Sequence, residues 1–520
     1  MKKTRNKKQV RMRRVIRVMA ASTFLVIFLS ITSCQRLEKS YSMTLENEEV
    51  GEYSAGVSVH DPSIIIREGD YYIFGSHMAT AKSNDLVEWE TVSEGYTPLN
   101  PVYTQFFSGN GIFNYAGAAT SVIPTDDGSY HVWAPDVIYN EALDKYMMYS
   151  SISSTWNASN IALLFADDIE GPYSYSEAIV YSGFTRSTLE STNVLDYVDS
   201  DFALSNYTMS GNSYNFNEFP NAIDPTVFYD EDGKMWMVYG SWSGGIFLLE
   251  IDENTGLPIR QPEDEENRVD PYFGKKILGG GHMSIEGPYI HYDSETNYYY
   301  LFVSYGGLAR DGGYQIRVYR SRDVDGDYVD MSGAFPLQGD AQSLFGLKIT
   351  GNYILPSLED AYMAPGHNSV VYDDSEDRLL NVFHTRFDNG TEFHEPRVHE
   401  MVMNSDSWPV MLPYKVSSQS SEFDLEEKDL SGRYYLVNLG TRIDDYIVEP
   451  EIIYLDRNGE FSIENESGEW TYSETDSYFN VTINSVEYKG VAGKTLDEAG
   501  NERIFFSVVG NNQSIWAVKE

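Results

Sequence analysis

The apolar residues of this 520-residue chain fall into many short runs instead of long amphipathic stripes. Most runs are about four to seven residues long, are rich in Tyr, Val, Ile and Phe, and are bounded by Gly, Asp, Asn or Pro. Apolar residues spaced three and four positions apart, as in a helix, are scarce. Short aromatic and β-branched runs between turn residues are typical of β-strands, so the pattern predicts an all-β protein.

One two-part sequence motif, which we call the phrase, recurs five times along the chain. Its first part begins at His60, Trp133, Ile223, Glu286 and Gly366. Its second part, an aromatic strand after an acidic or Gly-containing turn, covers residues 71–76, 145–150, 235–241, 298–304 and 379–384. A hairpin of this size cannot bury its own face, and such repeats stack or radiate so that neighbours cover one another. The repeats therefore predict a stacked or radial β-architecture over about residues 55–412.

Three of the five copies place a carboxylate near the start of the phrase, at Asp61, Asp224 and Glu286. In a radial arrangement the first strand of every repeat lines one central axis, so these side chains would converge on one pocket, and we expect them in the same register of the repeat. Asp61 and Asp224 precede Pro, which predicts an extended backbone at each of them. Glu286 precedes Gly-Pro, a tight turn that could direct its side chain toward the axis.

The chemistry that needs such a set of acids is the cleavage of a glycosidic bond. An inverting glycosidase uses one carboxylate as the base that activates water and one carboxylic acid that protonates the leaving oxygen. A third carboxylate can keep the acid protonated near neutral pH through the repulsion between like charges. The three acids are therefore the candidate catalytic residues.

Two further polar residues lie in these phrases. Asp136 follows Pro and is one step out of phase, so we expect a buried structural residue that hydrogen-bonds the neighbouring backbone. His367 takes the in-phase position of the fifth copy. Beside three carboxylates it could help to hold a central cation, or it could only hydrogen-bond the inner strands.

The rest of the chain divides by composition. Insertions at 94–130 and 185–220 are polar and rich in Gly, Ser and Asn, and are predicted to be loops over the pocket face. Residues 413–430 have the composition of a linker. Residues 431–520 show short strands and tight turns, which predict a second, smaller β-barrel or sandwich.

The net charge of −42 narrows the class of substrate. Residues 1–33 carry nine Lys or Arg and no acid, so the remainder has 28 basic and 79 acidic residues, or −51. A surface this acidic repels nucleic acid and anionic lipid. It suits a neutral substrate and calcium, and it argues against a polyanion such as unesterified polygalacturonate.

The first residues predict an export signal of the lipoprotein type. A basic segment over 2–17 and a short apolar run over 18–31 precede Cys34, and Ile31-Thr32-Ser33-Cys34 resembles a bacterial lipobox. Cys34 is the only cysteine, which excludes an internal disulfide and a thiolate metal cluster. We expect residues 1–33 to be removed, Cys34 to carry the lipid, residues 34–54 to form a tether, and the protein to be exported as a cell-surface lipoprotein. An uncleaved anchor is the alternative.

These phrases resemble glycoside hydrolase family 43 over about residues 58–412. Residues 239–246, 285–290 and 312–318 are similar to the arabinanase branch, and the tail over 432–519 is similar to the C-terminal lipocalin-like barrel of the longer extracellular endo-arabinanases. The resemblance implies a five-bladed β-propeller followed by a smaller β-barrel. It also implies an inverting enzyme that cleaves internal 1,5-α-L-arabinofuranosidic bonds of arabinan and arabino-oligosaccharides.

The same resemblance implies roles for single residues. Asp61 is the general base, Glu286 the general acid, and Asp224 the residue that tunes the pKa of the acid and orients it. His367 matches the axial histidine that in arabinanases supports one central, largely water-ligated Ca2+. Besides Asp61 and Asp224, the implied sugar-binding residues are Asn157, Asn221, Ala222, Ile223, Ser241, Trp242 and Ser243. The loop over 154–158 departs from the family pattern at Trp156, which could reshape a subsite.

Two other functions stay open at this point. One is an exo-acting α-L-arabinofuranosidase or β-xylosidase of the same family, which a pocket walled by the insertions would favour over an open groove. The other is a non-catalytic surface glycan-binding lipoprotein, against which the intact set of three acids argues. We expect a monomer that has no nucleic-acid partner and contacts a membrane only through its lipid anchor.

Overall fold

The computed structural model describes residues 45, 48–95, 99–104, 111–117, 131–154, 157–210, 212–337, 344–417, 419–463 and 466–520. The predicted signal peptide, Cys34 and most of the predicted tether lie outside these residues. Within them, no helix has the length and apolar character that a membrane crossing requires.

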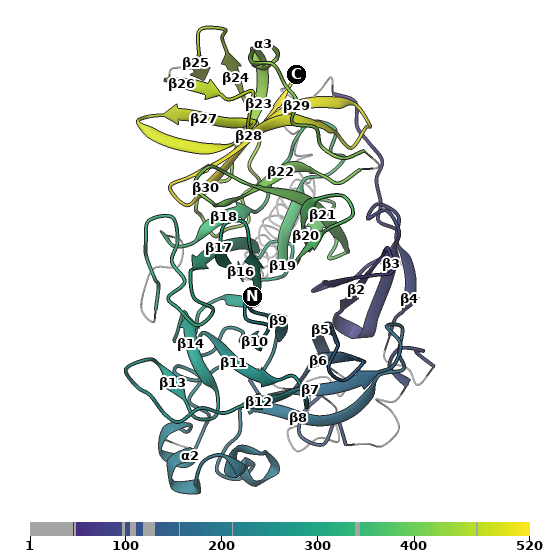
Figure 1. Cartoon of the computed structure of the whole chain (residues 1–520), viewed down its shortest axis with the longest axis vertical. Coiled ribbons are helices and arrows are strands. Elements are labelled where there is room, and N and C mark those ends of the chain that lie inside the picture. Colours follow the sequence, from purple (N-terminus) through teal and green to yellow (C-terminus); the bar gives the residue numbers. More distant parts are fainter. Residues whose placement is uncertain are drawn as a thin grey trace, which may run out of the picture. The chain divides into compact units, whose positions relative to one another are not determined.

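Five antiparallel sheets, formed by consecutive segments of the chain, are the blades of a propeller (Figure 1). The first blade contains β1 (Ser63–Arg67), β2 (Asp70–Gly75), β3 (Ala79–Ser83) and β4 (Glu90–Ser93). The second contains β5 (Val132–Asn140), β6 (Lys145–Ser153), β7 (Ser159–Ala166) and β8 (Ser174–Ser182). The third contains β9 (Thr226–Tyr229), β10 (Met235–Tyr239), β11 (Ile246–Asp252), β12 (Leu257–Ile259), β13 (Val269–Asp270) and β14 (Gly274–Leu278).

The last two blades have four strands each. The fourth contains β15 (Ile285–Asp293), β16 (Tyr298–Tyr305), β17 (Gln315–Ser321) and β18 (Leu347–Thr350). The fifth contains β19 (Tyr362–Asp373), β20 (Arg378–Phe387), β21 (His394–Met403) and β22 (Pro409–Lys415). The first strand of each blade is the predicted first part of the repeat and the second is its aromatic strand. The predicted all-β fold with five repeats is therefore confirmed.

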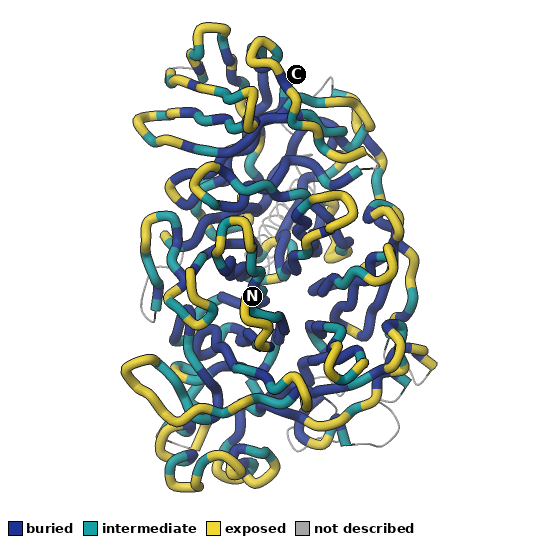
Figure 2. The backbone as a smooth tube through the Cα atoms, viewed as in Figure 1, coloured by how far each residue is buried: buried dark blue, intermediate teal, exposed yellow. Residues whose placement is uncertain are grey.

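A closed eight-stranded barrel follows the propeller. Its strands are β23 (Gly432–Asn438), β24 (Glu451–Leu455), β25 (Glu460–Ile463), β26 (Glu466–Tyr472), β27 (Tyr478–Ile483), β28 (Val486–Leu496), β29 (Glu502–Gly510) and β30 (Gln513–Lys519). The short helix α3 (Glu427–Leu430) lies between β22 and β23. The barrel has an aromatic core of its own, which includes Phe461, Trp470, Phe479 and Phe506. Figure 2 shows buried positions concentrated along the strands and exposed ones at the turns.

The insertion over 185–220 is more ordered than the predicted loop. It contains the short 3-10 helices η3 (Leu189–Ser191) and η4 (Val194–Asp196) and the α-helix α2 (Ser200–Asn206). Asp199 caps α2 by accepting a hydrogen bond from the Phe202 backbone N–H at 2.8 Å. Tyr207 and Tyr214 are buried between the insertion and the third blade. The prediction missed these elements because each is too short to show a helical period. Much of the insertion over 94–130 lies outside the described residues.

Each inner strand has a residue in the left-handed region either two positions before its first residue or inside the strand, and we call it the kink residue. These residues are Asp61 (φ 55°), Ala134 (36°), Asp224 (57°), Gly287 (57°) and His367 (48°). The prediction of an extended backbone at the two Asp residues was wrong. The preference of a residue before Pro is a local one, and here contacts with the preceding blade hold a different conformation.

The kink also corrects the predicted register of Glu286. Gly287, not Glu286, is the kink residue of the fourth blade, and strand pairing shifts between Glu286 and Tyr289. Glu286 therefore occupies the position before the kink, whereas Asp61 and Asp224 are themselves kink residues. The prediction that the three acids share one register was wrong by one residue.

Candidate active site

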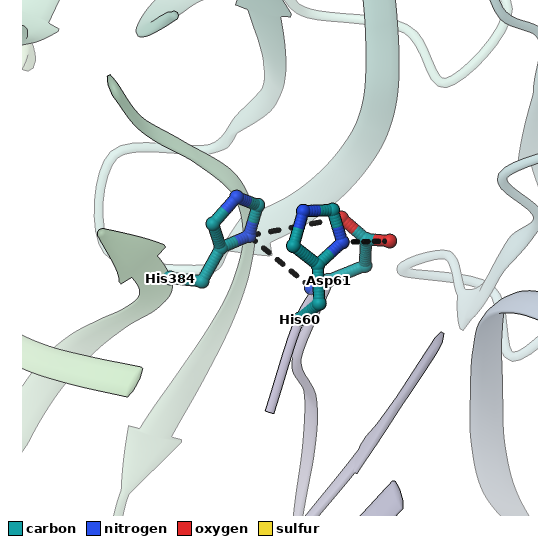
Figure 3. Close-up of side chains that lie close together, drawn as sticks. All are labelled: His60, Asp61 and His384. Carbon is teal, nitrogen blue, oxygen red and sulfur yellow. Dashed lines mark hydrogen bonds and ion pairs between the residues drawn. The ribbon is translucent and has the colours of Figure 1, made fainter. Parts of the chain in front are cut away.

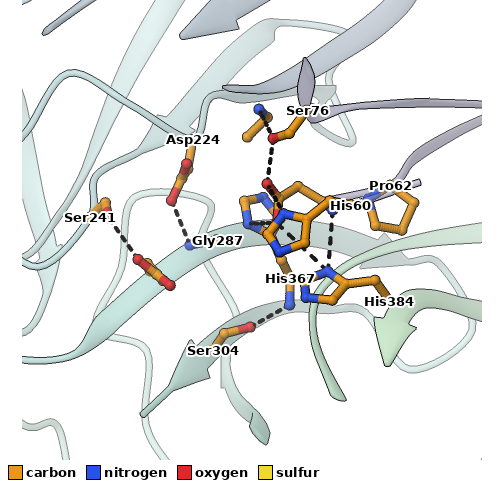
Figure 4. Close-up of polar contacts among 12 residues, drawn as sticks. His60, Pro62, Ser76, Asp224, Ser241, Gly287, Ser304, His367 and His384 are labelled. Carbon is orange, nitrogen blue, oxygen red and sulfur yellow. Dashed lines mark hydrogen bonds and ion pairs between the residues drawn. The ribbon is translucent and has the colours of Figure 1, made fainter. Parts of the chain in front are cut away.

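Asp61, Asp224 and Glu286 come from the first, third and fourth blades, and all three are buried, with 6%, 5% and 7% of their surface exposed. They lie close enough for the charge of each to act on the ionisation of another. Figure 4 shows the polar contacts of this site, with Asp224 on one side and the His60 and His367 rings on the other. The structure thus brings together the three acids that the repeats indicated.

Asp61 is held on both carboxylate oxygens. Ser76 Oγ donates to Asp61 Oδ2 at 2.5 Å, and His60 Nδ1 lies 2.7 Å from the same oxygen. His367 Nδ1 lies 3.1 Å from Oδ1. Burial alone would raise the pKa of Asp61, but His60 and His367 hold it well below the usual range. Asp61 is therefore ionised at neutral pH, as a base must be.

Asp224 and Glu286 have the opposite tendency. Burial is the largest cause that raises the pKa of each, and the negative charge of neighbouring carboxylates adds to it. The Gly287 N–H donates to Asp224 Oδ2 at 3.1 Å, and Ser241 Oγ donates to Glu286 Oε2 at 2.9 Å. The pair therefore retains a proton at a pH at which Asp61 has lost its own.

His367 lies at the axis between these groups. Its backbone N–H donates to Ser304 Oγ at 2.7 Å, and its ring packs so closely on Gly287 that a Cβ there would lie 2.9 Å from the ring. Burial lowers the pKa of His367, but the charges of Asp61, Asp224 and Glu286 outweigh it and raise this pKa to about 9. The surroundings of His367 thus favour positive charge.

Two sets of residues could hold a metal. One set is His60, Asp61 and His384, whose ligand atoms lie close together (Figure 3). However, His384 Nδ1 already accepts the Asp61 backbone N–H at 3.2 Å, and the His60 and His384 rings stack with their centres 3.9 Å apart. The second candidate is His367, whose side chain is 14% exposed. Its Nδ1 faces Asp61, so Nε2 is the ring atom that could bind a metal. Calcium prefers six to eight oxygen ligands. The axis therefore fits a cation that water ligates for the most part.

The implied sugar-binding residues of the second and third blades are joined through Ser182. Ser182 Oγ donates to the Asn157 carbonyl at 2.8 Å and lies 3.2 Å from Asn221 Oδ1, and it accepts the Ala222 N–H at 2.9 Å. Ala222 has no exposed surface, whereas Asn157 and Ile223 are half-buried. Ser182 thus fixes this wall of the site.

The other implied sugar-binding residues flank Glu286. Ser241 bonds its carboxyl group, and the Trp242 backbone N–H donates to the Ile285 carbonyl at 2.9 Å. The half-buried Trp242 ring lies 5.5 Å from the His282 ring. Ser243 is buried and pairs with His282 through a β-bridge. Trp156 lies outside the described residues.

Asp136 occupies the structural place expected of it. Its carboxylate accepts hydrogen bonds from Ser63 Oγ and, at 2.6 Å, from the Val227 N–H. It joins the inner strands of the first, second and third blades.

The sequence analysis missed four residues that contact these groups. They are His60, Ser76, His384 and Tyr314, the last of which hydrogen-bonds Glu286. A signal was present for two of them, because Ser76 and His384 are the polar residues that end predicted aromatic strands. Nothing in the local pattern marked His60 or Tyr314.

Known proteins resemble this chain over most of its length. The model of glycosyl hydrolases family 43 matches residues 179–409, and a model described as a C-terminal lipocalin-like domain matches residues 413–517. The chain is 36% identical over 479 residues to extracellular endo-α-(1→5)-L-arabinanase 2 of Bacillus subtilis, a match that covers 89% of this chain and 93% of that protein.

A second relative comes from Thermotoga petrophila. Its extracellular endo-α-(1→5)-L-arabinanase is 35% identical over 477 residues, which covers 89% of this chain and 93% of that protein. A crystal structure of endo-1,5-α-L-arabinanase from the same organism superimposes with a TM-score of 0.76 at 34% identity, and covers 91% of this chain and 100% of that chain.

Proposed function

Because the chain belongs to glycosyl hydrolases family 43, we propose that it is an inverting endo-1,5-α-L-arabinanase, which cleaves internal bonds of arabinan. The names of the two relatives with 36% and 35% identity support arabinan as the substrate and an endo mode of action. The exo-acting and the non-catalytic alternatives have less support, because the matches to these two endo-arabinanases extend over nearly the whole chain.

The observation that carries the catalytic assignment is the opposite ionisation of neighbouring carboxyl groups. His60 and His367 hold the pKa of Asp61 low against the effect of burial, whereas burial and like charge raise the pKa of Glu286. Two carboxyl groups that differ in this way can act as base and acid at the same pH. The same causes raise the pKa of Asp224, to about 7, so ionisation separates Asp61 from the other two acids but not these two from each other. We therefore assign Asp61 as the general base from its ionisation, and Glu286 rather than Asp224 as the general acid from the family resemblance.

The reaction would proceed in one displacement. Asp61 accepts a proton from a water molecule while the water oxygen bonds to the anomeric carbon. The glycosidic C–O bond breaks, and Glu286 gives its proton to the leaving oxygen, so one fragment ends in an anomeric hydroxyl of inverted configuration and the other in a new alcohol hydroxyl. Ser241 donates to Oε2 of Glu286 and so fixes the orientation of this carboxyl group. Asp224, in its ionised form, keeps Glu286 protonated between turnovers.

The products released from linear arabinan test this function. Internal cleavage produces a ladder of oligosaccharides at early times, and the viscosity of the solution falls before much reducing sugar appears. Chromatography of timed samples distinguishes this result from the release of arabinose alone. Arabinose as the only early product would show exo action, and no product from the intact wild-type protein would indicate a glycan-binding protein.

We further propose that His367 helps to hold one Ca2+ at the axis, with water completing its shell. The three surrounding carboxylates, whose charge raises the pKa of His367 to about 9, support a site that attracts positive charge. Because a protonated imidazole cannot bind a metal, the ion would have to displace the His367 proton. The ion would supply positive charge that favours the ionised carboxylates.

Elemental analysis of protein purified without chelator tests the metal proposal. We expect about one equivalent of calcium in the wild type and a large loss in His367→Ala, because that variant lacks the single protein ligand. EDTA should lower the melting temperature of the wild type, since a ligand bound only to the native state stabilises it, and should leave His367→Ala unchanged. A wild type with less than about a tenth of an equivalent of metal would contradict the proposal.

We also propose that Cys34 carries lipid and anchors the enzyme at the cell surface. The names of the extracellular relatives support export. Wild-type protein should partition into detergent and begin at Cys34, and Cys34→Ala should fail to partition, because stable anchoring requires acyl chains. Mass spectrometry of the mature N-terminus gives the measurement. A soluble wild type with another N-terminus would contradict this proposal.

A further inference from the structure

The backbone N–H of every kink residue donates to a side chain of the preceding blade. The five bonds are Asp61 N–H to His384 Nδ1 (3.2 Å), Ala134 N–H to Ser76 Oγ (2.8 Å), Asp224 N–H to Ser151 Oγ (2.9 Å), Gly287 N–H to Asp224 Oδ2 (3.1 Å) and His367 N–H to Ser304 Oγ (2.7 Å). His384 belongs to the fifth blade and binds the first, so the bonds close into a circle, which we call the interblade ring. Figure 4 shows the bonds of Gly287 and His367.

Four of the five acceptors occupy one equivalent position. Ser151, Ser304 and His384 each lie on the second strand of a blade, opposite the residue that precedes the kink. Ser76 holds the same place in the first blade, since its N–H donates to the His60 carbonyl at 2.9 Å. The acceptor position is therefore a property of the repeat.

The third blade has no acceptor side chain at this position, and Asp224, a proposed catalytic residue, takes its place. The equivalent position is Gly240, whose N–H donates to the Ile223 carbonyl at 3.0 Å. Gly240 has a φ of 131°, and a Cβ on it would lie 2.5 Å from the Gly245 carbonyl oxygen, so the position admits no side chain. The carboxylate of Asp224 takes the place of the missing acceptor and binds Gly287, the neighbour of Glu286.

We propose that the interblade ring positions the catalytic carboxylates, with His384 and Ser151 as positioning residues for Asp61 and Asp224. Gly240 leaves the ring open in the third blade so that Asp224 closes it and is thereby fixed beside Glu286. This inference rests on the roles proposed above for the three acids.

The physical reason is that the kink conformation needs a partner. A left-handed backbone is unfavourable for residues other than Gly, and a buried N–H without an acceptor is costly. The acceptor in the preceding blade offsets both effects. When it is removed, the kink can relax toward the extended conformation that the following Pro favours, and the attached carboxylate moves.

Ser151 provides a clean test because it has no exposed surface and cannot contact substrate. Ser151→Ala should lower kcat about tenfold or more with KM within about twofold, because small misplacements of reacting groups are expensive. Ser151→Thr retains the hydroxyl and should recover most of the lost kcat. The matched control is Ser153→Ala, which removes a buried hydroxyl two residues along β6 whose side-chain hydrogen bond within the described part of the chain is to Ser159 Oγ, at 2.9 Å. It should leave kcat near the wild-type value.

Two results would overturn the role of Ser151. One is a wild-type kcat in Ser151→Ala, and the other is an equal loss of kcat in Ser153→Ala. The contribution of Asp224 to the ring has a readout that does not depend on catalysis. Asp224→Asn retains an oxygen that can accept the Gly287 N–H, whereas Asp224→Ala does not. The melting temperature of Asp224→Asn should therefore be close to that of the wild type, and that of Asp224→Ala should be several degrees lower. Equal melting temperatures would refute the ring even if the catalytic roles proved correct.

Discussion

Asp61→Asn and Glu286→Gln are each expected to lower kcat on arabinan by about two to four orders of magnitude, because a positioned base or acid contributes that much to a rate. Both replacements are close in shape to the native side chains, so the site should keep its packing. Initial rates of reducing-end release give the measurement. Near-wild-type turnover in either variant would contradict the assignment.

The same two variants should differ in thermal stability. The depressed pKa of Asp61 means that its ionised form stabilises the fold above the usual pKa, and that this contribution is lost as the pH falls. The raised pKa of Glu286 means that its ionisation destabilises the fold as the pH rises. At pH 7 the melting temperature should therefore fall in Asp61→Asn and hold or rise in Glu286→Gln.

Asp136→Asn is the matched control for both. Asp136 is a buried carboxyl group of an inner strand, and burial raises its pKa to about 6, but its partners are Ser63 and a backbone N–H. Its replacement should change stability and leave kcat near the wild-type value. A loss of turnover as large as that of the catalytic variants would show that any buried acid near the axis has this effect.

Much of the fold could be predicted because its signal is local. Each aromatic strand follows its inner strand after one short turn, so the five hairpins are visible as a repeated phrase. The positions of β2, β6, β10, β16 and β20 agree with the predicted strands to within a few residues. The barrel could be predicted as a separate β-domain for the same reason.

The kink conformation could not be predicted because its cause is not local. Pro62 and Pro225 favour an extended residue before them, yet Asp61 and Asp224 have positive φ. The hydrogen bonds that hold them there come from His384 and Ser151, which lie 323 and 73 residues away in the sequence. The one-residue error at Glu286 has the same origin, because the kink of the fourth blade lies at Gly287 and not at the acid.

The roles of the acids were also beyond the local pattern. Asp61 and Asp224 have the same Asp-Pro motif, and nothing within it separates a base from a residue that tunes an acid. The difference arises from neighbours in space: His60 and His367 contact Asp61, whereas Asp224 faces the Gly287 N–H and the charge of Glu286. The sequence could therefore suggest separate roles for these acids only through the family resemblance.

Asp224→Asn is expected to lower kcat and to move the high-pH limb of the pH–rate profile to lower pH, by about one unit or more, the effect of a nearby like charge. Glu286 must be protonated to act as the acid, so activity falls as the pH rises through its pKa. The negative charge of Asp224 resists the ionisation of Glu286, and its removal lets Glu286 lose its proton at lower pH.

The profile of kcat/KM against pH for wild type and variant gives the measurement, and Asp136→Asn serves again as the control. If the high-pH limb reflects the pKa of Glu286, and if the charge of Asp224 raises that pKa, the limb should not move in Asp136→Asn. Asn at 224 can still accept the Gly287 N–H, so a shift in that variant reflects charge and not a loss of the ring. A limb that stays in place in Asp224→Asn, or moves to higher pH, would contradict the role of Asp224 and leave burial alone as the reason that Glu286 keeps its proton.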